Sequence, residues 1–325
     1  MDYGRLIGDA WTMTWRYRFL WVLALFAPAG VGGCGFNFPG NFNLPSSTGP
    51  RGNPTTPSPF GRSGPNARDF ERVGTAIGTW IGEHLALILA LAAVAVILFL
   101  AFLFLYFVAQ GALATATIRL ARGEPAAIRP AWQAGLSYFW RYVGLWLLQI
   151  LIFLAAAIVV GILVGIGTVL LRQVGGGTAV ALGVILGLLG FLLALAAIVA
   201  VILFSIVITY AQRIIVNNNV GPGAALNRGV ALTRARLGTS ALLWLINFGL
   251  GIGIGIATAL VDFVILIPLA IVGAIFFIAF RTSPITFIYA GLALLVFIVG
   301  AWVVSAIGNT FMWNYWTLGY LKLEE

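Results

Sequence analysis

The run "LALILALAAVAVILFLAFLFLYFVAQ" extends from Leu85 to Gln110 and contains no charged residue. About 20 consecutive apolar residues suffice for a helix to cross a hydrocarbon core of about 30 Å. Backbone groups find no water inside a bilayer, so a segment that spans it is either a helix or a strand of a closed barrel. The alternation of apolar and polar residues that a barrel strand requires is absent. The run therefore predicts a transmembrane helix.

The composition of the whole chain extends this interpretation. Of the 325 residues, 61% are hydrophobic and only 8% are charged, whereas soluble domains carry roughly a quarter charged residues. The formal net charge of +9 would favour nucleic acid as a partner of a soluble protein. In a membrane protein the excess is a topology signal, because Arg and Lys accumulate in cytoplasmic loops. We therefore expect an all-α membrane protein that binds no nucleic acid.

Apolar runs predict six transmembrane helices in total. Apart from the run quoted above, they cover residues 19–33, 143–171, 179–211, 239–280 and 285–307. The run 239–280 is too long for one upright span, and Asp262 and Pro268 predict where this helix leaves the core or kinks. One kinked helix and a broken helix are the two alternatives for it. The last five predicted helices form a membrane domain over residues 72–321.

The N-terminal part of the chain holds three further signals. Residues 1–18 predict an interfacial helix, because aromatic and apolar side chains recur on one of its faces. These side chains are Tyr3, Ile7, Trp11 and Trp15. Residues 34–71 are rich in Gly, Pro, Ser and Asn, which predicts a disordered external loop. The only cysteine, Cys34, excludes an internal disulfide, and the apolar run before it resembles a lipoprotein signal, so lipidation of Cys34 is an alternative to a first span.

Arginine is unevenly distributed between the two sides of the predicted membrane. Three segments, before the first span, between the second and third, and between the fourth and fifth, hold Arg5, Arg16, Arg18, Arg119, Arg122, Arg129, Arg141, Arg213, Arg228, Arg234 and Arg236. The short turns on the other side hold only Arg172 and Arg281. Under the positive-inside rule both termini are cytoplasmic. We expect a multi-pass protein of a prokaryotic cytoplasmic (cell) membrane.

Two polar interruptions of the apolar sequence share one pattern, and a shift of 94 positions aligns them without a gap. The first set, Thr115, Arg119, Ala131, Gly135 and Gly144, falls on Thr209, Arg213, Ala225, Gly229 and Gly238. Each unit is the end of a long helix, an arginine, a short amphipathic segment and a glycine that opens the next span. The two units share an orientation and therefore predict a parallel repeat over residues 115–213 and 209–320. Coincidence among common residue types is the alternative.

The two amphipathic segments are expected to lie along the cytoplasmic surface of the membrane. Their predicted apolar faces are Ile128, Trp132, Gly135, Phe139 and Tyr142 in the first unit, and Leu226, Val230, Thr233 and Leu237 in the second. Arginines on or beside these segments would contact anionic lipid headgroups. The candidate headgroup contacts are Arg122, Arg129, Arg141, Arg228, Arg234 and Arg236.

Three stretches of the sequence together resemble a known group of proteins. They are "ATIRLARGEPAAIRPAWQAGLSYFWRYVGLW", "IIVNNNVGPGAALNRGVALTRARLG" and "FMWNYWTLGYL". They resemble prokaryotic six-helix membrane proteins, a group that includes the membrane domain attached to some glycerophosphodiester phosphodiesterases. The resemblance covers about residues 74–321. It implies a fold and not the phosphodiesterase activity, because that activity needs a separate barrel domain with His and acidic metal ligands.

The residue types that carry catalysis are sparse. The only histidine, His84, stands beside Glu83, but a general base or a metal site needs several converging groups. The Gly-Pro-Gly at 221–223 lacks the third glycine of a dinucleotide fingerprint, so it predicts a turn. We expect no enzyme activity, no cofactor, and no catalytic, cofactor-binding or metal site.

Polar residues within the apolar runs form a second candidate site. Asp262 is the only acid inside an apolar run, and with Asn247 and Gln149 it would form an intramembrane polar site. The commoner use of Asn and Gln is to bond helices together, and we interpret Asp262 as lying at the outer interface near Arg281. The expected function is that of a membrane scaffold or lipid-interacting module, with membrane lipids and other membrane proteins as partners. The alternative is a transporter of a small or lipid-like solute.

Overall fold

The computed structural model describes residues 2–27, 82–173, 177–281 and 283–324, without the side chains of 170–182. The chain divides into two compact units, one of residues 1–35 with 104–325 and the other of residues 36–103. All regular secondary structure in the described part is helical, which confirms the all-α prediction. In the smaller unit the described part is the apolar start of one long helix, which continues into the larger unit.

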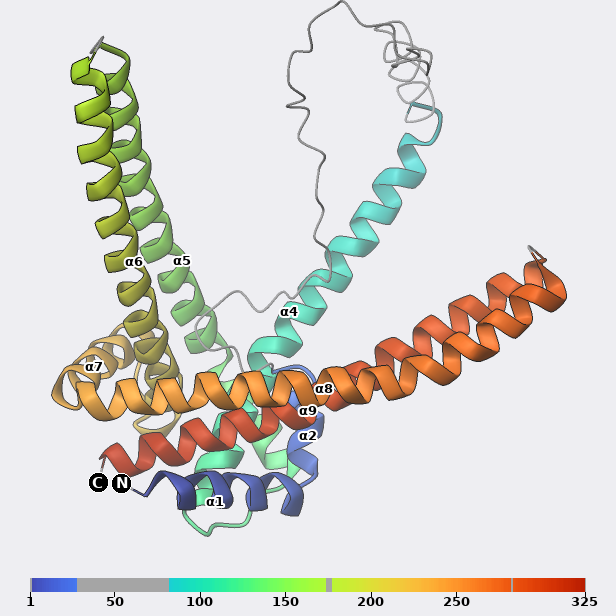
Figure 1. Ribbon diagram of the computed structural model, residues 1–325. Helices are drawn as coiled ribbons and strands as arrows, with labels where there is room; N and C mark the ends of the chain where they lie inside the picture. The colour runs from blue at the N-terminus through green and yellow to red at the C-terminus, as the bar shows by residue number, and fades with distance from the viewer. Residues whose placement is uncertain (1, 28–81, 174–176, 282, 325) are drawn as a thin grey trace, which may run out of the picture. The chain divides into compact units, whose positions relative to one another are not determined.

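Eight helices follow one another in the described ranges (Figure 1). They are α1 (Tyr3–Arg16), α2 (Phe19–Ala24), α4 (Leu85–Ala121), α5 (Ile128–Gln173), α6 (Gly177–Asn217), α7 (Pro222–Ala235), α8 (Leu237–Phe280) and α9 (Pro284–Glu324). Five of them, α4, α5, α6, α8 and α9, are long and apolar enough to cross a membrane. The prediction of several membrane-crossing helices is therefore confirmed.

The first predicted span, residues 19–33, was wrong in the part that the structure describes. Only Phe19–Ala24 is helical there, over 6 residues, which is far short of the about 20 that a span needs. One face of this helix is covered by protein, because Leu20 and Leu23 are at most 1% exposed, whereas Val22 is 49% exposed. The described ranges thus hold five candidate spans rather than six. Residues 28–33, Cys34 and the loop predicted at 34–71 lie outside them.

The long apolar run at 239–280 lies within one helix. α8 continues through Pro268 from Leu237 to Phe280, over 44 residues. At 1.5 Å per residue it is about 66 Å long, about twice the thickness of a hydrocarbon core. Of the two alternatives left by the sequence, the structure selects the unbroken helix.

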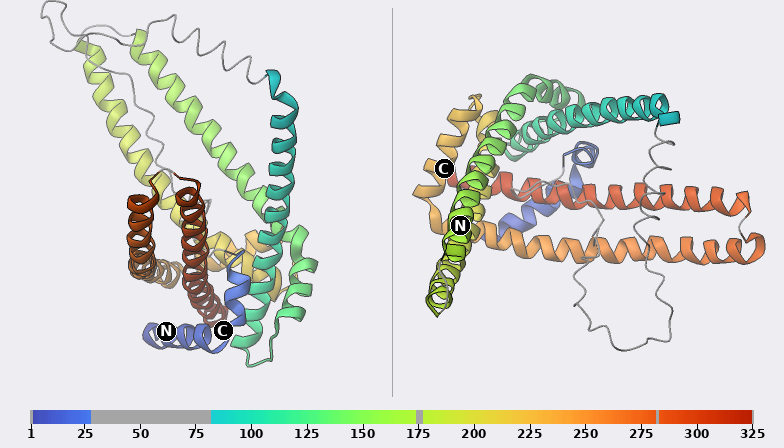
Figure 2. Two further views of the ribbon diagram at one scale, coloured as in Figure 1. Left: turned by 90° about the vertical axis from the view of Figure 1, so that its right-hand side faces the viewer. Right: turned by 90° about the horizontal axis from the view of Figure 1, so that it is seen from above.

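Two pairs of long helices in the larger unit form antiparallel hairpins, α5 with α6 and α8 with α9 (Figures 1 and 2). Glycines bring the second pair close together. A Cβ at Gly308 would lie 2.7 Å from Cγ2 of Ile254, and a Cβ at Gly300 would lie 3.2 Å from Cδ1 of Ile265. The most apolar windows of α5, α8 and α9 are not covered by other parts of the protein. Exposed apolar surface of this extent is typical of a membrane-contacting protein.

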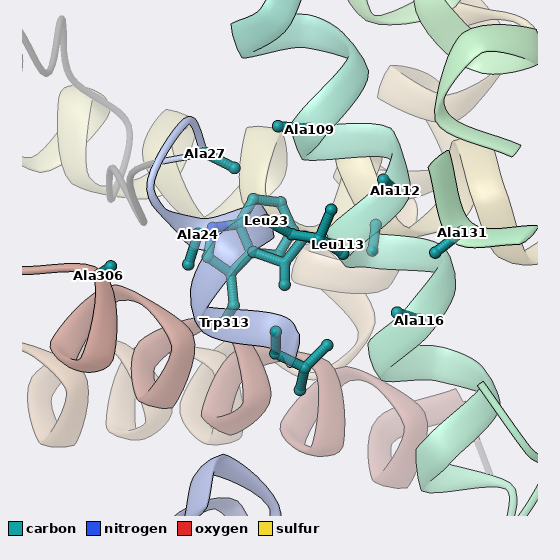
Figure 3. Packing of buried hydrophobic residues seen from close by; sticks show 12 residues of the cluster. Leu23, Ala24, Ala27, Ala109, Ala112, Leu113, Ala116, Ala131, Ala306 and Trp313 are labelled. Carbon is teal, nitrogen blue, oxygen red and sulfur yellow. The ribbon is translucent and has the colours of Figure 1, made fainter. Parts of the chain in front are cut away.

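The packed core of the larger unit lies where α2, α4 and α9 meet (Figure 3). α4 contributes mostly alanines, among them Ala109, Ala112 and Ala116. Because these side chains are small, the larger side chains of Leu23 and Trp313 fill the space between the helices. The polar C-terminal half of α9 is therefore a core element, and the apolar parts of the long helices are the exposed ones.

The N-terminal helix α1 packs along α9. Asn314 donates a hydrogen bond from Nδ2 to Oγ1 of Thr14 (2.9 Å), and the ring of Trp11 lies 5.8 Å from that of Phe311. Trp11 remains 53% exposed and Trp15 42% exposed. The predicted helix is thus confirmed with its tryptophans outward, and its location at the membrane interface stays a prediction.

Candidate functional site

The connection after α6 is the separate helix α7, which presents small residues to its neighbours. Its buried positions are Ala225, Gly229 and Thr233, four residues apart and hence on one face. A Cβ at Gly229 would lie 2.9 Å from the carbonyl oxygen of Val207 on α6. The predicted apolar face was only partly right, because Thr233 is buried but Leu237 is 48% exposed. Because the backbones of α7 and α6 are in contact at Gly229, only small side chains fit on this face of α7.

The connection after α4 is built differently, because its amphipathic segment is the start of α5 itself. A Cβ at Gly135 would lie 2.9 Å from the backbone nitrogen of Ala112 on α4. Tyr142 is buried as predicted, whereas Ile128 is 44% exposed. Both connections therefore have a glycine packed on the preceding helix. They differ in that α7 is separate from the long helix α8, whereas the segment after α4 is continuous with α5. The parallel repeat stays a prediction.

The three consecutive asparagines after α6 join elements that are distant in sequence. Asn217 accepts a hydrogen bond at Oδ1 from Nη2 of Arg122. Its Nδ2 donates to Oε2 of Glu324 (2.7 Å) and lies 3.2 Å from the hydroxyl of Tyr320. Asn219 has a φ of 52°, which asparagine tolerates better than most residues, and its Oδ1 accepts from Nη1 of Arg141. This asparagine cluster ties the ends of α4, α6 and α9 to α5.

A buried arginine on α6 has no acidic partner in the described part of the chain. Arg213 is 2% exposed and donates from Nη1 to the carbonyl oxygen of Thr209 (2.7 Å). Its guanidinium carbon lies 4.5 Å from the ring centroid of Trp313, a cation–π contact. Its Nε has no hydrogen-bond partner. The sequence pattern grouped Arg213 with the topology-determining arginines, but it is a core residue.

The six predicted headgroup arginines separate into two groups. Arg129, Arg228, Arg234 and Arg236 are exposed, and their side chains have no hydrogen bond or ion pair to another described residue. Arg122 and Arg141 are bound by the asparagine cluster. The first group is therefore free to contact an external anion, and the second has a structural task within the protein.

The three residues predicted to form an intramembrane polar site are not brought together. Asn247 and Asp262 lie 15 positions apart on α8, about 22 Å along the axis, and Gln149 belongs to α5. Asn247 is buried and Asp262 is half-buried, and Oδ1 of each has no partner. The predicted position of Asp262 beside Arg281 was wrong, because 19 helical positions separate them by about 28 Å.

A cavity of about 400 Å³ opens between the ends of α4 and α9. It is lined by Ala121, Arg122, Leu318, Leu321, Lys322 and Glu324. Within the described ranges no group of three His, Cys, Asp or Glu side chains could hold a metal ion. The cavity is therefore a mixed polar and apolar recess at the basic end of the helices, and Asp262 does not line it.

Apolar helices of membrane-spanning length, joined by connections that carry exposed arginines, define the class of a helical multi-pass membrane protein. The particular family follows from a match over residues 11–322: the chain belongs to DUF7544, a family of unknown function. No curated protein and no solved structure matches the chain. The resemblance to the membrane domain of glycerophosphodiester phosphodiesterases therefore stays a prediction.

Proposed function

We propose that the protein is a non-enzymatic membrane scaffold that binds anionic phospholipid headgroups at the connections after α4 and α6. The observation that carries this proposal is that four arginines on or beside these connections are exposed and have no side-chain partner in the described part: Arg129, Arg228, Arg234 and Arg236. An exposed guanidinium presents five N–H donors in a fork that matches phosphate oxygens. An external phosphate group would supply the acceptors that these side chains do not find among the described residues.

Three finer features belong to the same proposal. Both termini and the two arginine-bearing connections lie in the cytoplasm of a prokaryotic cell, where the leaflet is anionic. The two connections are units of a parallel repeat, and this is supported by Gly135 and Gly229, each of which packs on the preceding helix. The partners are membrane lipids and, through the exposed apolar helices, other membrane proteins.

Lipid retention after purification tests the proposal. Each arginine that reaches an anionic surface contributes about 1 kcal/mol, so replacing Arg228, Arg234 and Arg236 by Gln removes about 3 kcal/mol. That loss corresponds to binding weakened by roughly two orders of magnitude. We expect less anionic phospholipid in the mass spectrum of the purified triple variant. The matched control replaces the same three residues by Lys, which keeps the charge and should keep most of the lipid.

The orientation of the protein has to be measured in the same samples. Arginines that only determine topology would, once removed, invert the chain or prevent its insertion. A cysteine at position 220, with Cys34 replaced, reports the side of the membrane through its access to an impermeant thiol reagent. Correctly oriented Gln variant that retains as much anionic lipid as the wild type would refute the proposal.

The second candidate function is transport of a small or lipid-like solute. It is favoured by Asn247 and Asp262 on α8, because each carries a buried side-chain oxygen without a hydrogen-bond partner in the described part. Uptake of candidate solutes into vesicles that depends on Asp262 would support transport. Lipid retention that depends on the arginines, without such uptake, would support the scaffold.

A further inference from the structure

Asp262 lies near the middle of the longest stretch of α8 that carries no other charged or amide side chain. Between Asn247 and Arg281 the helix carries no other charged or amide side chain. A hydrocarbon core takes up about 20 helical residues. Every window of that length between Asn247 and Arg281 includes Asp262, because it lies 15 positions after the first and 19 before the second. The carboxyl group is therefore inside the hydrocarbon region in every placement in which α8 crosses it between Asn247 and Arg281.

The carboxyl belongs to the face of α8 that packs on α9. The half-buried positions of this face recur every three or four residues, at Gly251, Ile254, Thr258, Asp262, Ile265, Leu269, Gly273 and Phe276. One turn from Asp262, Ile265 contacts α9 at Gly300. Oδ1 of Asp262 is enclosed and has no hydrogen-bond partner. The side chain thus points into the hairpin rather than along the outer surface of the helix.

The facing surface of α9 supplies no compensating charge. Around Gly300 its half-buried positions are Phe297, Ala301, Val304 and Ser305, none of them charged, and only Ser305 has a polar side chain. Along the two helices, the nearest described charged residues are Arg236 and Arg281 on the α8 side and Lys322 on the α9 side. No ion pair involves Asp262 in the described part. An ionised carboxylate without a partner in such surroundings is costly, so a cation beside it would be stabilising.

We propose that Asp262 is a binding site for a monovalent cation, either a proton or Na⁺, within the α8–α9 hairpin. A proton bound to one carboxyl oxygen removes the charge. Na⁺ would be held by the carboxylate together with the hydroxyl of Thr258, one turn earlier on the same face. This site is independent of the lipid-binding arginines and gives the chain an ion-dependent state that a purely passive scaffold would lack.

A hydrophobic carbodiimide tests the site in the full-length protein in phospholipid nanodiscs. Dicyclohexylcarbodiimide partitions into the bilayer and reacts with a protonated carboxyl: the acid proton moves to a carbodiimide nitrogen while the carboxyl oxygen bonds to the central carbon. We expect a mass adduct on Asp262 that is lost in Asp262→Asn. A water-soluble carbodiimide with glycine ethyl ester should modify exposed Glu124 and leave Asp262 unmodified.

The condition that slows the reaction of Asp262 with dicyclohexylcarbodiimide identifies the bound ion. Slowing by Na⁺ at constant pH, lost in Thr258→Val, assigns Na⁺. Slowing by raised pH alone, unaffected by Thr258→Val, assigns a proton. Loss of the adduct in Asp262→Asn could also result from unfolding. We expect Asp262→Asn to melt at the wild-type temperature and Asp262→Glu to keep the adduct, and these two results exclude unfolding as the cause. The proposal is overturned by modification of Asp262 with the water-soluble reagent as fast as Glu124, or by absence of any hydrophobic adduct. Neither result bears on lipid retention by the arginines.

Discussion

Replacing Gly135 by alanine adds one methyl group where α5 passes closest to α4. The new Cβ would lie 2.9 Å from the backbone nitrogen of Ala112 and 3.1 Å from its Cβ, and the carbonyl oxygen of Val108 would be closer still. Optimal contacts between heavy atoms lie at about 3.5–4.0 Å, so α4 has to move away. Overpacking of this kind costs about 1–3 kcal/mol, while alanine in place of glycine gains about 1 kcal/mol in helix propensity.

The net result for Gly135→Ala is a destabilisation of up to about 2 kcal/mol, and we expect the upper part of this range because the closest atoms belong to the backbone and cannot rotate aside. Gly229→Ala should behave alike but more mildly, because its Cβ would approach the Val207 carbonyl at 2.9 Å and the nitrogen of Ala211 only at 3.6 Å. The matched control is Gly223→Ala on α7, where no atom lies within 4 Å of the added Cβ.

Thermal unfolding in a mild detergent measures these changes. Each kcal/mol shifts the midpoint by about 2–4 °C in a chain of several hundred residues, so Gly135→Ala should melt several degrees below the wild type. Gly223→Ala should melt at or slightly above it. If Gly135→Ala and Gly229→Ala both melt at or above the wild-type temperature, the close packing of the two connections on α4 and α6 is refuted.

Two further predictions address the basic end of the helices. The first is a double-mutant cycle of Arg213→Met and Trp313→Leu. The two losses of unfolding free energy should be non-additive by about 0.5–2 kcal/mol, which is the strength of a cation–π contact. Additive losses would show that the two side chains do not interact. With Cys34 replaced, cysteines at positions 125 and 220 should both react with an impermeant thiol reagent from the cytoplasmic side only, because the arginines around them favour that side, and reaction of either from the outside contradicts the orientation.

The apolar runs predicted the long helices because length and hydropathy alone decide whether a segment can cross a bilayer. They failed at residues 19–33, where the short helix α2 buries Leu23 against α4 and α9 rather than facing lipid. Hydropathy does not distinguish apolar residues that meet lipid from those that meet protein. The same limitation hid Arg213, whose burial depends on Trp313, 100 positions later in the chain.

The sequence predicted which arginines belong to the candidate site, but not how they are bound within the protein. The sequence indicated the exposed arginines, since they lie in short polar connections. It gave no signal that Asn217 and Asn219 would bind two of those arginines, because these bonds join residues 95 and 78 positions apart. The run of three asparagines beside a helix end was the available clue, because asparagine competes with backbone bonding and collects at helix ends and turns.

The pairing of α1 and α2 with α9 determines when the protein can finish folding. Thr14 is bound by Asn314, 300 positions later, and Leu25 accepts a bond from Trp302 across 277 positions. At a synthesis rate of 5–20 residues per second, roughly 15–60 s pass before these partners leave the ribosome. During that time the sides of α1 and α2 that pack on α9 have no partner. If helix α1, with its exposed tryptophans, lies at the membrane interface as predicted, that surface would hold it until the last helix is made.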